Sequence, residues 1–370
     1  MSNNSSRYAK LRFWFYAKRW FWISVIWIGI SNLLFFYDYF TLSAHRVLNS
    51  NFDFLSNYLA NLIFAICGSF FGGFFVIFFM EKWLRKNAFW KAILYIIVTY
   101  TLTSILIGFI GSLYLESENL DLPLFNSEVI EETYFFLTGW EFLKNYSIWL
   151  VIIISTLIVL MVNNKYGPGV FKDYLLGKYF KPKKERRIFM FADIKNATSI
   201  AEKIGEERYF YFLKDFFNDI TPAIITTYGD IYQYVGDEIV ISWKMKVGMQ
   251  NGNAIECFYN MKKLIANKAS TYMSKYGFVP YFKVGYHFGN VMVGEIGQIK
   301  RDIAFSGDVL NTTSRIQAKC NELSVDILVS EAFANIAYKL PEGIVRHNLG
   351  IHSLKGKLEE IKLVTFRNNS

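Results

Sequence analysis

The stretch "DIYQYVGDEIVISW", residues 230–243, decides the fold of the second half of this chain. Apolar residues typical of β-strands stand on both sides of a Gly-Asp-Glu turn, which predicts a β-hairpin. Asp237 at the tip of an ordinary hairpin would be a solvated turn residue. Because both flanking strands are apolar enough for a core, this carboxylate has to be compared with the other acids of the chain.

A second carboxylate follows another apolar strand. The run "RIFMFADI", 187–194, is almost continuously apolar, and Asp193 stands near its end. If the two strands are neighbours, Asp193 and Asp237 meet at one end of a sheet, where two carboxylates repel each other unless a cation separates them. A pair of Mg²⁺ ions, which prefer oxygen ligands, would satisfy both.

The rest of the second half mixes helices and strands. Apolar residues recur at helical spacing over 196–229, and further helices are expected over about 251–275 and 308–323. The stretch 281–297 predicts a pair of strands, and 326–336 predicts a strand followed by a helix. We therefore expect an α+β domain with the two acids at the edge of its sheet.

Two further groups of residues favour a substrate that carries phosphates. The stretch "IKNATS" opens a helix directly after Asp193, and free N–H groups at a helix start favour a triphosphate. Asn311 and Arg315 are four residues apart on an expected helix, so they project from the same face and suit charge that develops on phosphorus. The N–H groups concerned belong to Asn196, Ala197 and Thr198.

The first half of the chain has a different character. The whole chain is 53% hydrophobic with 19% charged residues, and its long apolar runs lie before residue 165. A helix needs about 20 apolar residues to cross a bilayer core of about 30 Å. Four segments are long and apolar enough. Because there are four of them, transmembrane helices are a better interpretation than buried helices of a soluble protein. The four segments are 20–37, 58–80, 92–115 and 148–162.

Charges in the loops predict the orientation of these spans. Lysine and arginine gather before the first span, between the second and third, and after the fourth, whereas the loop 116–147 is acidic. Because basic loops stay on the cytoplasmic side, we expect both termini in the cytoplasm and an integral protein of the cell inner membrane or plasma membrane, in contact with lipid. The net charge of +9 belongs largely to these segments, so we expect no nucleic-acid partner.

The sequence therefore predicts four parts. A cytoplasmic segment 1–19 precedes a four-helix transmembrane domain 20–163, and a connector 164–186 leads to the catalytic domain 187–370. Gly and Pro residues early in the connector break the fourth helix. The connector is either a plain linker or a rigid coupling element between the membrane and the second domain.

The motifs of the second half resemble the catalytic domain of the class III nucleotidyl cyclases, which make cyclic AMP or cyclic GMP. Five motifs occur in the family's order over about 187–366, which makes the resemblance specific. The four spans and the "GKYFKP" connector also resemble membrane-bound bacterial members of this group. The motifs are "FMFADIKNATSIAEKIG", "YVGDEIV", "GYHFGNVMVGEIG", "RDIAFSGDVLNTTSRIQ" and "LKGK".

This resemblance implies a ferredoxin-like palm, with a central, mostly antiparallel sheet flanked by helices. It also implies two Mg²⁺ ions per site, for which Mn²⁺ can substitute. Asp193 and Asp237 match the family's metal-binding aspartates, and Ile194 would add its backbone carbonyl. One metal would activate the ribose 3′-hydroxyl of the substrate, and the other would hold the leaving pyrophosphate.

The remaining family roles fall on three residues. Asn311 matches the residue that orients the ribose, and Arg315 matches the one that stabilises the pentavalent phosphate. Lys355, in "LKGK", matches the lysine that contacts the terminal phosphates. In this family the metal motifs come from one catalytic domain and the Asn, Arg and Lys from a second. Because this chain carries both sets once, the resemblance implies a homodimer with two symmetric sites.

The purine-selecting positions depart from the family pattern. The adenine-selecting lysine, four residues before the second metal aspartate, is replaced by Gln233, and its usual Asp or Thr partner is replaced by Ala304. The glutamate typical of guanylate cyclases is also missing. Gln233 can donate and accept hydrogen bonds, so it suits either purine. We expect ATP as substrate, with GTP or mixed purine use as the alternative.

Two other functions are open. Diguanylate cyclases carry a hairpin that "YVGDEIV" superficially resembles, but they need Gly and Phe where this chain has Val235 and Ile239, and they lack the "NTTSR" motif. A catalytically silent membrane sensor is the second alternative. The presence of both metal aspartates, the Asn and the Arg argues against it.

Overall fold

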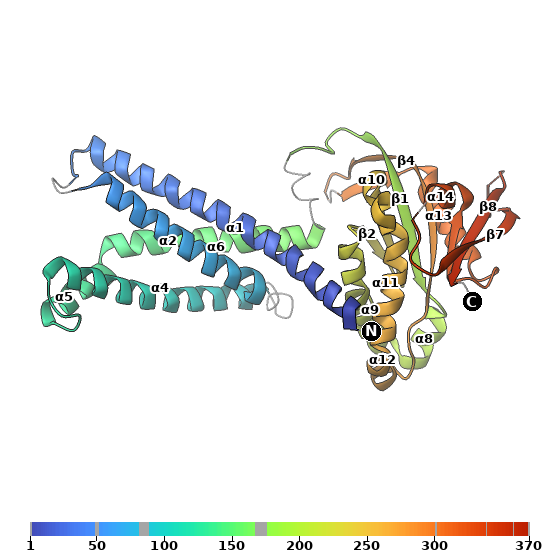
Figure 1. Ribbon diagram of the computed structural model, residues 1–370, viewed down its shortest axis with the longest axis horizontal. Helices are drawn as coiled ribbons and strands as arrows, with labels where there is room; N and C mark the ends of the chain where they lie inside the picture. The colour runs from blue at the N-terminus through green and yellow to red at the C-terminus, as the bar shows by residue number, and fades with distance from the viewer. Residues whose placement is uncertain are drawn as a thin grey trace. The chain divides into compact units, whose positions relative to one another are not determined.

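The computed structural model describes residues 2–48, 52–80, 89–166, 176–299, 302–337, 339–357 and 359–368. The chain divides into two compact units, Phe13–Tyr166 and Gly167–Ser370 together with Met1–Arg12, which are described separately (Figure 1). Two features of the sequence-based prediction lie outside the described residues. They are the basic loop at 81–88 and the first part of the connector, 167–175.

In the described part of the first unit, helices are joined by turns and loops, and none of its described residues lies in a β-strand. Four of its segments are long and apolar enough to cross a membrane, namely Tyr16–Ala44, Phe54–Phe79, Ile93–Leu120 and Trp140–Asn163, as the sequence predicts. The elements are α1 (Ser2–Ala44), α2 (Phe54–Phe75), the π-helical turn η1 (Val76–Met80), α4 (Phe89–Leu120), α5 (Ser127–Thr138) and α6 (Trp140–Tyr166).

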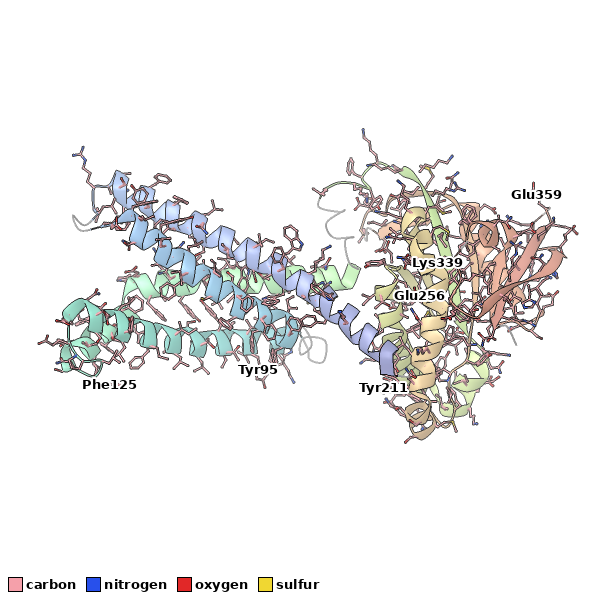
Figure 2. All side chains as sticks on the ribbon, in the orientation of Figure 1. Tyr95, Phe125, Tyr211, Glu256, Lys339 and Glu359 are labelled. Carbon is pink, nitrogen blue, oxygen red and sulfur yellow. The ribbon has the colours of Figure 1, made fainter. Side chains whose placement is uncertain are left out.

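Much of the apolar surface of this unit faces outward. Exposed apolar side chains lie along the helices, such as Tyr95 of α4 at 53% exposure, and also in the turn before α5, where Phe125 is 79% exposed (Figure 2). Such exposure would be unfavourable in water and suits a lipid environment. Hydrogen bonds join the helices to one another. Trp20 Nε1 donates to the carbonyl oxygen of Phe70 over 2.8 Å, and Trp27 Nε1 donates to Thr156 Oγ1 over 3.1 Å.

The short helix α5 lies in the acidic loop for which we predicted no secondary structure. The side chain of Asn126 accepts a hydrogen bond from the backbone N–H of Glu128, which caps the start of the helix. Val129 and Thr133 are buried. The many charged residues of this loop made its helical pattern hard to recognise in the sequence, because the helix has only 12 residues.

The second unit is built on one mixed sheet with the strand order β2-β3-β1-β4-β6-β8-β7, and β5 pairs with β4 outside this path. Every pairing is antiparallel except that of β4 with β6, so the predicted α+β fold with a mostly antiparallel sheet is confirmed. The strands are β1 (Lys183–Ile194), β2 (Asp230–Val235), β3 (Glu238–Lys244), β4 (Phe282–Ile296), β5 (Asp302–Ser306), β6 (Ile327–Ser330), β7 (Ile344–His352) and β8 (Ile361–Asn368).

Helices flank this sheet, and α9 and α11 lie side by side (Figure 1). The main core contains Met190 and Ala192 of β1 together with Phe216 and Phe258 of these two helices. The elements are α8 (Ala197–Ile204), α9 (Glu206–Thr226), α10 (Met245–Met249), the 3₁₀ turn η2 (Gln250–Gly252), α11 (Asn253–Asn267), α12 (Ala269–Tyr276), α13 (Asp308–Lys319) and α14 (Glu331–Ile336).

Helix α13 packs on the opposite face of the sheet. Phe189 and Phe191, which alternate with the core residues of β1, contact a second cluster that includes Val309 of α13. Side chains two residues apart on a strand share a face, so Asp193 belongs to the α13 side. This alternation decides which elements can reach the first aspartate.

The stretch 281–297, predicted as a pair of strands, is the single long strand β4 with flanking residues. Its glycines do not form a turn. A Cβ atom at Gly285 would lie 2.5 Å from the backbone N of Gln317, and one at Gly289 would lie 2.6 Å from Val309 Cγ2. These glycines let α13 lie close against β4, which sequence pattern alone does not distinguish from a turn.

Part of the predicted connector is anchored on the second unit. Tyr179 is only 6% exposed and joins the cluster beneath α13, and its carbonyl oxygen accepts a hydrogen bond from the N–H of Glu295 over 3.1 Å. Strand β1 begins at Lys183, inside the segment that we predicted as connector. The last residues of the connector therefore extend the sheet.

Candidate active site

A row of ionisable side chains crosses three neighbouring strands. Asp193 near the end of β1 is opposite Glu238 of β3 and opposite Lys283 of β4. Directly opposed residues on neighbouring strands project from the same face of a sheet. The row therefore lies on the α13 face, with Asp193 between a second acid and a base.

Asp237 joins this row from the turn between β2 and β3. The turn requires the left-handed backbone of Gly236, which has a φ of 60°. Burial, a hydrogen bond to Asp193 and the charge of Asp193 together raise the pKa of Asp237 to about 6. The two predicted metal-binding aspartates are thus brought together, as their positions after two strands suggested.

Glu238 is the third acid of the group. Burial raises its pKa to about 7, with further contributions from the charges of Asp193 and Asp237. Burial raises the pKa of Tyr209 of α9 to about 12, and the charges of Asp237 and Asp193 contribute to this rise. Burial and the charge of neighbouring acids raise these pKa values, and a bound cation would favour the ionised form of each acid.

Two side chains that do not belong to the acid group contact Asp193. Lys283 Nζ lies 3.1 Å from Asp193 Oδ2, and Gln317 Nε2 of α13 donates to the same oxygen over 3.0 Å. Lys283 also lowers the pKa values of Asp237 and Glu238, although less than burial raises them. We did not predict a role for either residue from the sequence. The only signal for Lys283 is a lone charge in the otherwise apolar strand "FKVGY", and Gln317 offers none.

The predicted phosphate-binding helix begins close to these acids. Asn196 has a left-handed φ of 58° and its side chain makes no capping hydrogen bond, and α8 starts at Ala197. Thr198 follows with an exposed side chain. The N–H groups at this helix start therefore lack a side-chain partner, which leaves them available to an anion.

The predicted transition-state pair lies on α13. Asn311 is exposed, and Arg315 is half-buried and donates from Nη1 to the carbonyl oxygen of Gly356 over 3.4 Å. Arg315 and Gln317 are separated by about 200° around the helix axis at 100° per residue. Since Gln317 points at Asp193, Arg315 points away from the aspartates of its own chain.

Lys355 and its neighbour Lys357 differ in their surroundings. Lys357 Nζ pairs with Asp308 Oδ2 over 2.7 Å, and this contact holds the pKa of Asp308 below its usual range. Lys355 is exposed. Of the two lysines in "LKGK", Lys355 has the more accessible side chain for a phosphate.

The predicted purine-selecting residues lie on β2 and β5. Gln233 is exposed and stands at a register shift in the pairing of β2 with β3, and Ala304 is half-buried opposite Gly294. Their chain neighbours are in contact, since the rings of Tyr232 and Phe305 have centroids 4.8 Å apart. The structure thus brings the two selecting positions into adjoining segments.

The donor set fits hard divalent cations. Carboxylate oxygens are the ligands that Mg²⁺ prefers, and it usually takes only one or two of them, with the substrate's phosphates completing its coordination. Within the described ranges, no group of three or more His, Cys, Asp or Glu side chains is arranged to hold a metal ion. The side chain of Ile194 is a hydrocarbon packed in the core, so its backbone carbonyl oxygen is the atom that could bind a metal. Two aspartates with a backbone carbonyl match that requirement.

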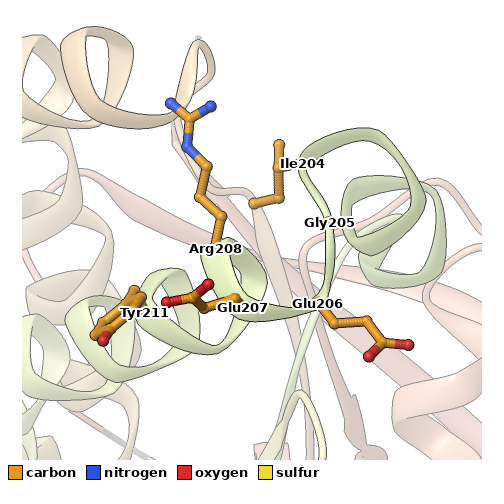
Figure 3. Close-up of a pocket in the computed structure, with 6 residues that line it drawn as sticks. All are labelled: Ile204, Gly205, Glu206, Glu207, Arg208 and Tyr211. Atoms are coloured by element: carbon orange, nitrogen blue, oxygen red, sulfur yellow. The ribbon is translucent and has the colours of Figure 1, made fainter.

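A surface pocket of about 430 Å³ lies elsewhere, at the junction of α8 and α9 (Figure 3). Two of its side chains are acidic, and Arg208 is engaged with the carbonyl oxygen of Lys275. None of the predicted site residues lines it. Its lining residues are Ile204, Gly205, Glu206, Glu207, Arg208 and Tyr211.

Comparison with known proteins identifies the family. A family model described as the adenylate and guanylate cyclase catalytic domain matches residues 181–367. The chain belongs to this family. Adenylate cyclase 2 of Rhizobium meliloti (strain 1021) is 32% identical over 209 residues, which are 56% of this chain and 57% of that protein. An adenylate cyclase of Anabaena cylindrica is 26% identical over 155 residues, 40% of this chain and 30% of that protein.

The chain therefore spans less than two thirds of the length of these relatives. Among solved structures, a bacterial light-regulated adenylyl cyclase matches with a TM-score of 0.50 and 20% identity, over 61% of this chain and 65% of that one. At this identity the match supports the fold alone. The cyclase domain occupies the second unit, and the aspartate pair lies within the matched residues.

Proposed function

We propose that this protein is a membrane-anchored adenylate cyclase that converts ATP to 3′,5′-cyclic AMP and pyrophosphate. The observation that carries the proposal is the meeting of Asp193 and Asp237 beside the start of α8, inside a domain of the cyclase family. The adenylate cyclase names of the curated relatives favour ATP over GTP.

The residues of the site have separate tasks in this reaction. Two Mg²⁺ ions, when bound, supply the charge that activates the ribose 3′-hydroxyl and holds the leaving pyrophosphate. Asp193, Asp237 and the backbone carbonyl of Ile194 hold these ions. The N–H groups at the start of α8 bind phosphate oxygens. Positioning and charge stabilisation are the main sources of rate in phosphoryl chemistry.

Residues of α13 and of the loop before β8 bind the ribose and the phosphates of the substrate. Asn311 orients the ribose so that its 3′-hydroxyl lies in line with the leaving group, and Arg315 neutralises charge on the pentavalent phosphate. Lys355 binds the terminal phosphates. These side chains have to converge with the aspartates around one nucleotide.

We propose that the convergence occurs across a homodimer. Arg315 projects on the side of α13 remote from Gln317 and therefore from its own Asp193. A second copy related by a twofold axis would present its Arg315 to these aspartates, and the arrangement would create two equivalent sites. The helices of the membrane unit would hold the two copies together within the bilayer.

The base is recognised with few hydrogen bonds from the predicted selectors. Gln233 can both donate to and accept from adenine, whereas Ala304 offers only apolar contact. Guanine would also be compatible with Gln233. We therefore propose ATP as the main substrate and weak discrimination against GTP.

Product analysis tests this function directly. The full chain in lipid nanodiscs would be incubated with ATP or GTP, in Mg²⁺ and in Mn²⁺, and the products identified by mass spectrometry. Cyclic AMP that disappears in the Asp237→Asn variant supports the proposal. Cyclic GMP as the main product would reassign the substrate, and the absence of any cyclic nucleotide in all four conditions would favour a silent membrane sensor.

A further inference from the structure

The edge strand β2 contains an irregularity directly before one of the predicted base-selecting residues. Ile231 is opposite Ile241 of β3. Gln233, two residues further along β2, is opposite Val240, which is only one residue from Ile241. Tyr232 is therefore the extra residue of a β-bulge, a feature that changes the direction of the side chains around it.

The side chain of Tyr232 reaches β5, the strand that carries the other selecting position. Its hydroxyl oxygen accepts a hydrogen bond from the backbone N–H of Phe305 over 3.4 Å, and the two rings meet edge to face with centroids 4.8 Å apart. Phe305 directly follows Ala304, just as Tyr232 directly precedes Gln233. The contact thus joins the chain neighbours of both selecting positions.

The position of β5 depends on such side-chain contacts. The strand has five residues, and among the described strands it pairs with β4 alone. Phe305 also meets Phe189 of β1 edge to face, with ring centroids 5.5 Å apart. Because a short strand with one neighbour has few backbone hydrogen bonds, the contacts of Phe305 decide where Ala304 lies relative to β2.

Arg187 of β1 supports the same ring from inside the sheet. Its guanidinium carbon lies 4.7 Å from the centre of the Phe305 ring, and its side chain is only 4% exposed. Burying a guanidinium group is costly unless its donors are satisfied. It donates to Glu185 Oε2 over 2.8 Å, to Ser242 Oγ over 2.9 Å and to Asp230 Oδ2 over 3.3 Å. These bonds connect β1, β2 and β3 behind the Phe305 ring.

We propose that Tyr232 and Arg187 are positioning residues for the purine base of the substrate. By fixing Phe305, they set the distance between the two selecting positions, Gln233 and Ala304. This inference rests on the proposed function, because it takes these two positions to face the base. Since Ala304 has no polar side-chain atom, recognition of the base depends strongly on how closely the two strands enclose it.

Equilibrium binding of 3′-deoxy-ATP tests the inference, because this nucleotide lacks the hydroxyl that attacks in the proposed reaction. Tyr232→Phe removes one oxygen atom and keeps the ring. We expect it to raise the dissociation constant about fivefold, as the loss of one hydrogen bond does, measured by calorimetry on the full chain in nanodiscs with Mg²⁺. A dissociation constant equal to that of the unmodified chain overturns the inference.

Inorganic tripolyphosphate separates base positioning from a general structural effect. It carries the phosphates without a base, so the unmodified chain and Tyr232→Phe should bind it within about twofold of each other. An equal loss of affinity for tripolyphosphate and for 3′-deoxy-ATP would overturn the inference, because the defect would then not concern the base.

Two further variants complete the comparison. Arg187→Met should also weaken 3′-deoxy-ATP binding and spare tripolyphosphate; if this variant does not fold, Tyr232→Phe decides alone. Tyr259→Phe is the matched control, because the Tyr259 hydroxyl also bonds to backbone, at the carbonyl oxygen of Phe366 over 3.1 Å, outside β2 and β5. Weaker 3′-deoxy-ATP binding by this control would overturn the inference.

Turnover distinguishes the inference from the proposed function. Tyr232→Phe should raise the KM for ATP about fivefold and leave kcat within about twofold, since the metal-binding aspartates are unchanged. A fall in kcat at constant KM overturns the inference. If the unmodified chain binds 3′-deoxy-ATP but forms no cyclic nucleotide, the proposed function fails and the binding comparison still decides the inference. If it binds neither 3′-deoxy-ATP nor tripolyphosphate, both fail.

Discussion

At the scale of single residues, the site contains neighbouring acids whose ionised forms are unfavourable when no cation is bound. Asp237 and Glu238 have pKa values raised to about 6 and about 7, first by burial and then by Asp193; the charge of Asp237 raises the pKa of Glu238 further. Lys283 offsets only part of this repulsion. The metal-free site therefore stores unfavourable electrostatic energy that metal binding would relieve.

Asp237→Asn should reduce cyclase turnover by at least about a hundredfold, because an amide oxygen is a much weaker ligand for a divalent cation than a carboxylate. The measurement is cyclic nucleotide formed per minute by the full chain in nanodiscs. Glu322→Gln, at a carboxylate that is 63% exposed and pairs with Lys319, is the control and should retain activity. Full activity of the Asp237 variant would contradict the assignment.

Glu238 makes the metal-free protein less stable as pH rises. Between pH 4.5, the ordinary value of its pKa, and pH 7, the folded state keeps a proton that the unfolded chain has lost. Stability therefore falls as pH rises through this window. Glu238→Gln should raise the stability of the metal-free protein at pH 8 by about 1–2 kcal/mol, after discounting for partial solvent exposure, and hardly change it at pH 4.

The measurement is the midpoint of thermal unfolding in the presence of a chelator, at pH 4, 6 and 8. Adding Mn²⁺ at pH 8 should stabilise the unmodified chain, because the cation favours the ionised acids. A Glu238→Gln midpoint that follows the unmodified chain at every pH would refute this explanation of the pH dependence.

At the scale of elements, the contact of α13 with β4 positions two side chains of the proposed site, Gln317 beside Asp193 and Arg315 on the opposite side of the helix. The helix sends Gln317 to Asp193 on one side and carries Arg315 on the other. This close packing is possible because β4 has glycines where α13 crosses it. The orientation of Arg315 thus depends on the absence of side chains on another strand.

Gly285→Ala should therefore destabilise the cyclase domain and reduce turnover. The new Cβ would lie 2.5 Å from the backbone N of Gln317, and backbone cannot move aside as a flexible side chain can. We expect a loss of about 1–3 kcal/mol in stability, measured by thermal unfolding. Gly111→Ala on α4, where nothing lies within 4 Å, is the control and should leave the midpoint unchanged.

At the scale of the whole molecule, one chain carries each set of site residues once, and the two sets face different ways. In the proposed mechanism, one copy of the cyclase domain therefore does not complete a site. We expect activity to depend on pairing of two chains, with the apolar helices of the first unit concentrating the chains in the plane of the membrane.

Mixing two inactive variants tests this pairing. Asp237→Asn and Arg315→Ala should each be nearly inactive as homodimers, but their heterodimer contains one site with both sets intact. Co-expression should restore about a quarter of the normal activity, because half of the dimers are mixed and each has one of two sites. No recovery, despite mixed dimers isolated through two affinity tags, would contradict a shared site.

Pattern in the sequence was sufficient for much of this architecture. Four apolar segments predicted the membrane helices, because crossing a bilayer requires a length of apolar chain that few other structures need. The paired strands ending in Asp193 and Asp237 predicted that two acids meet. Strands β5, β7 and β8 and helix α5 were not predicted, since their apolar residues are too few or too irregular to show a period.

The sequence by itself determined the family and the four apolar helices, and it predicted the acids of the proposed site, because these follow from local periodicity and from motifs in a fixed order. Only the tertiary structure decided that Lys283 and Gln317 hold Asp193, that β4 is one strand, and that Arg315 faces away from its own aspartates. Each of these depends on which strands pair and which helix covers them. Such neighbours are distant in the chain, and no local pattern records their contact.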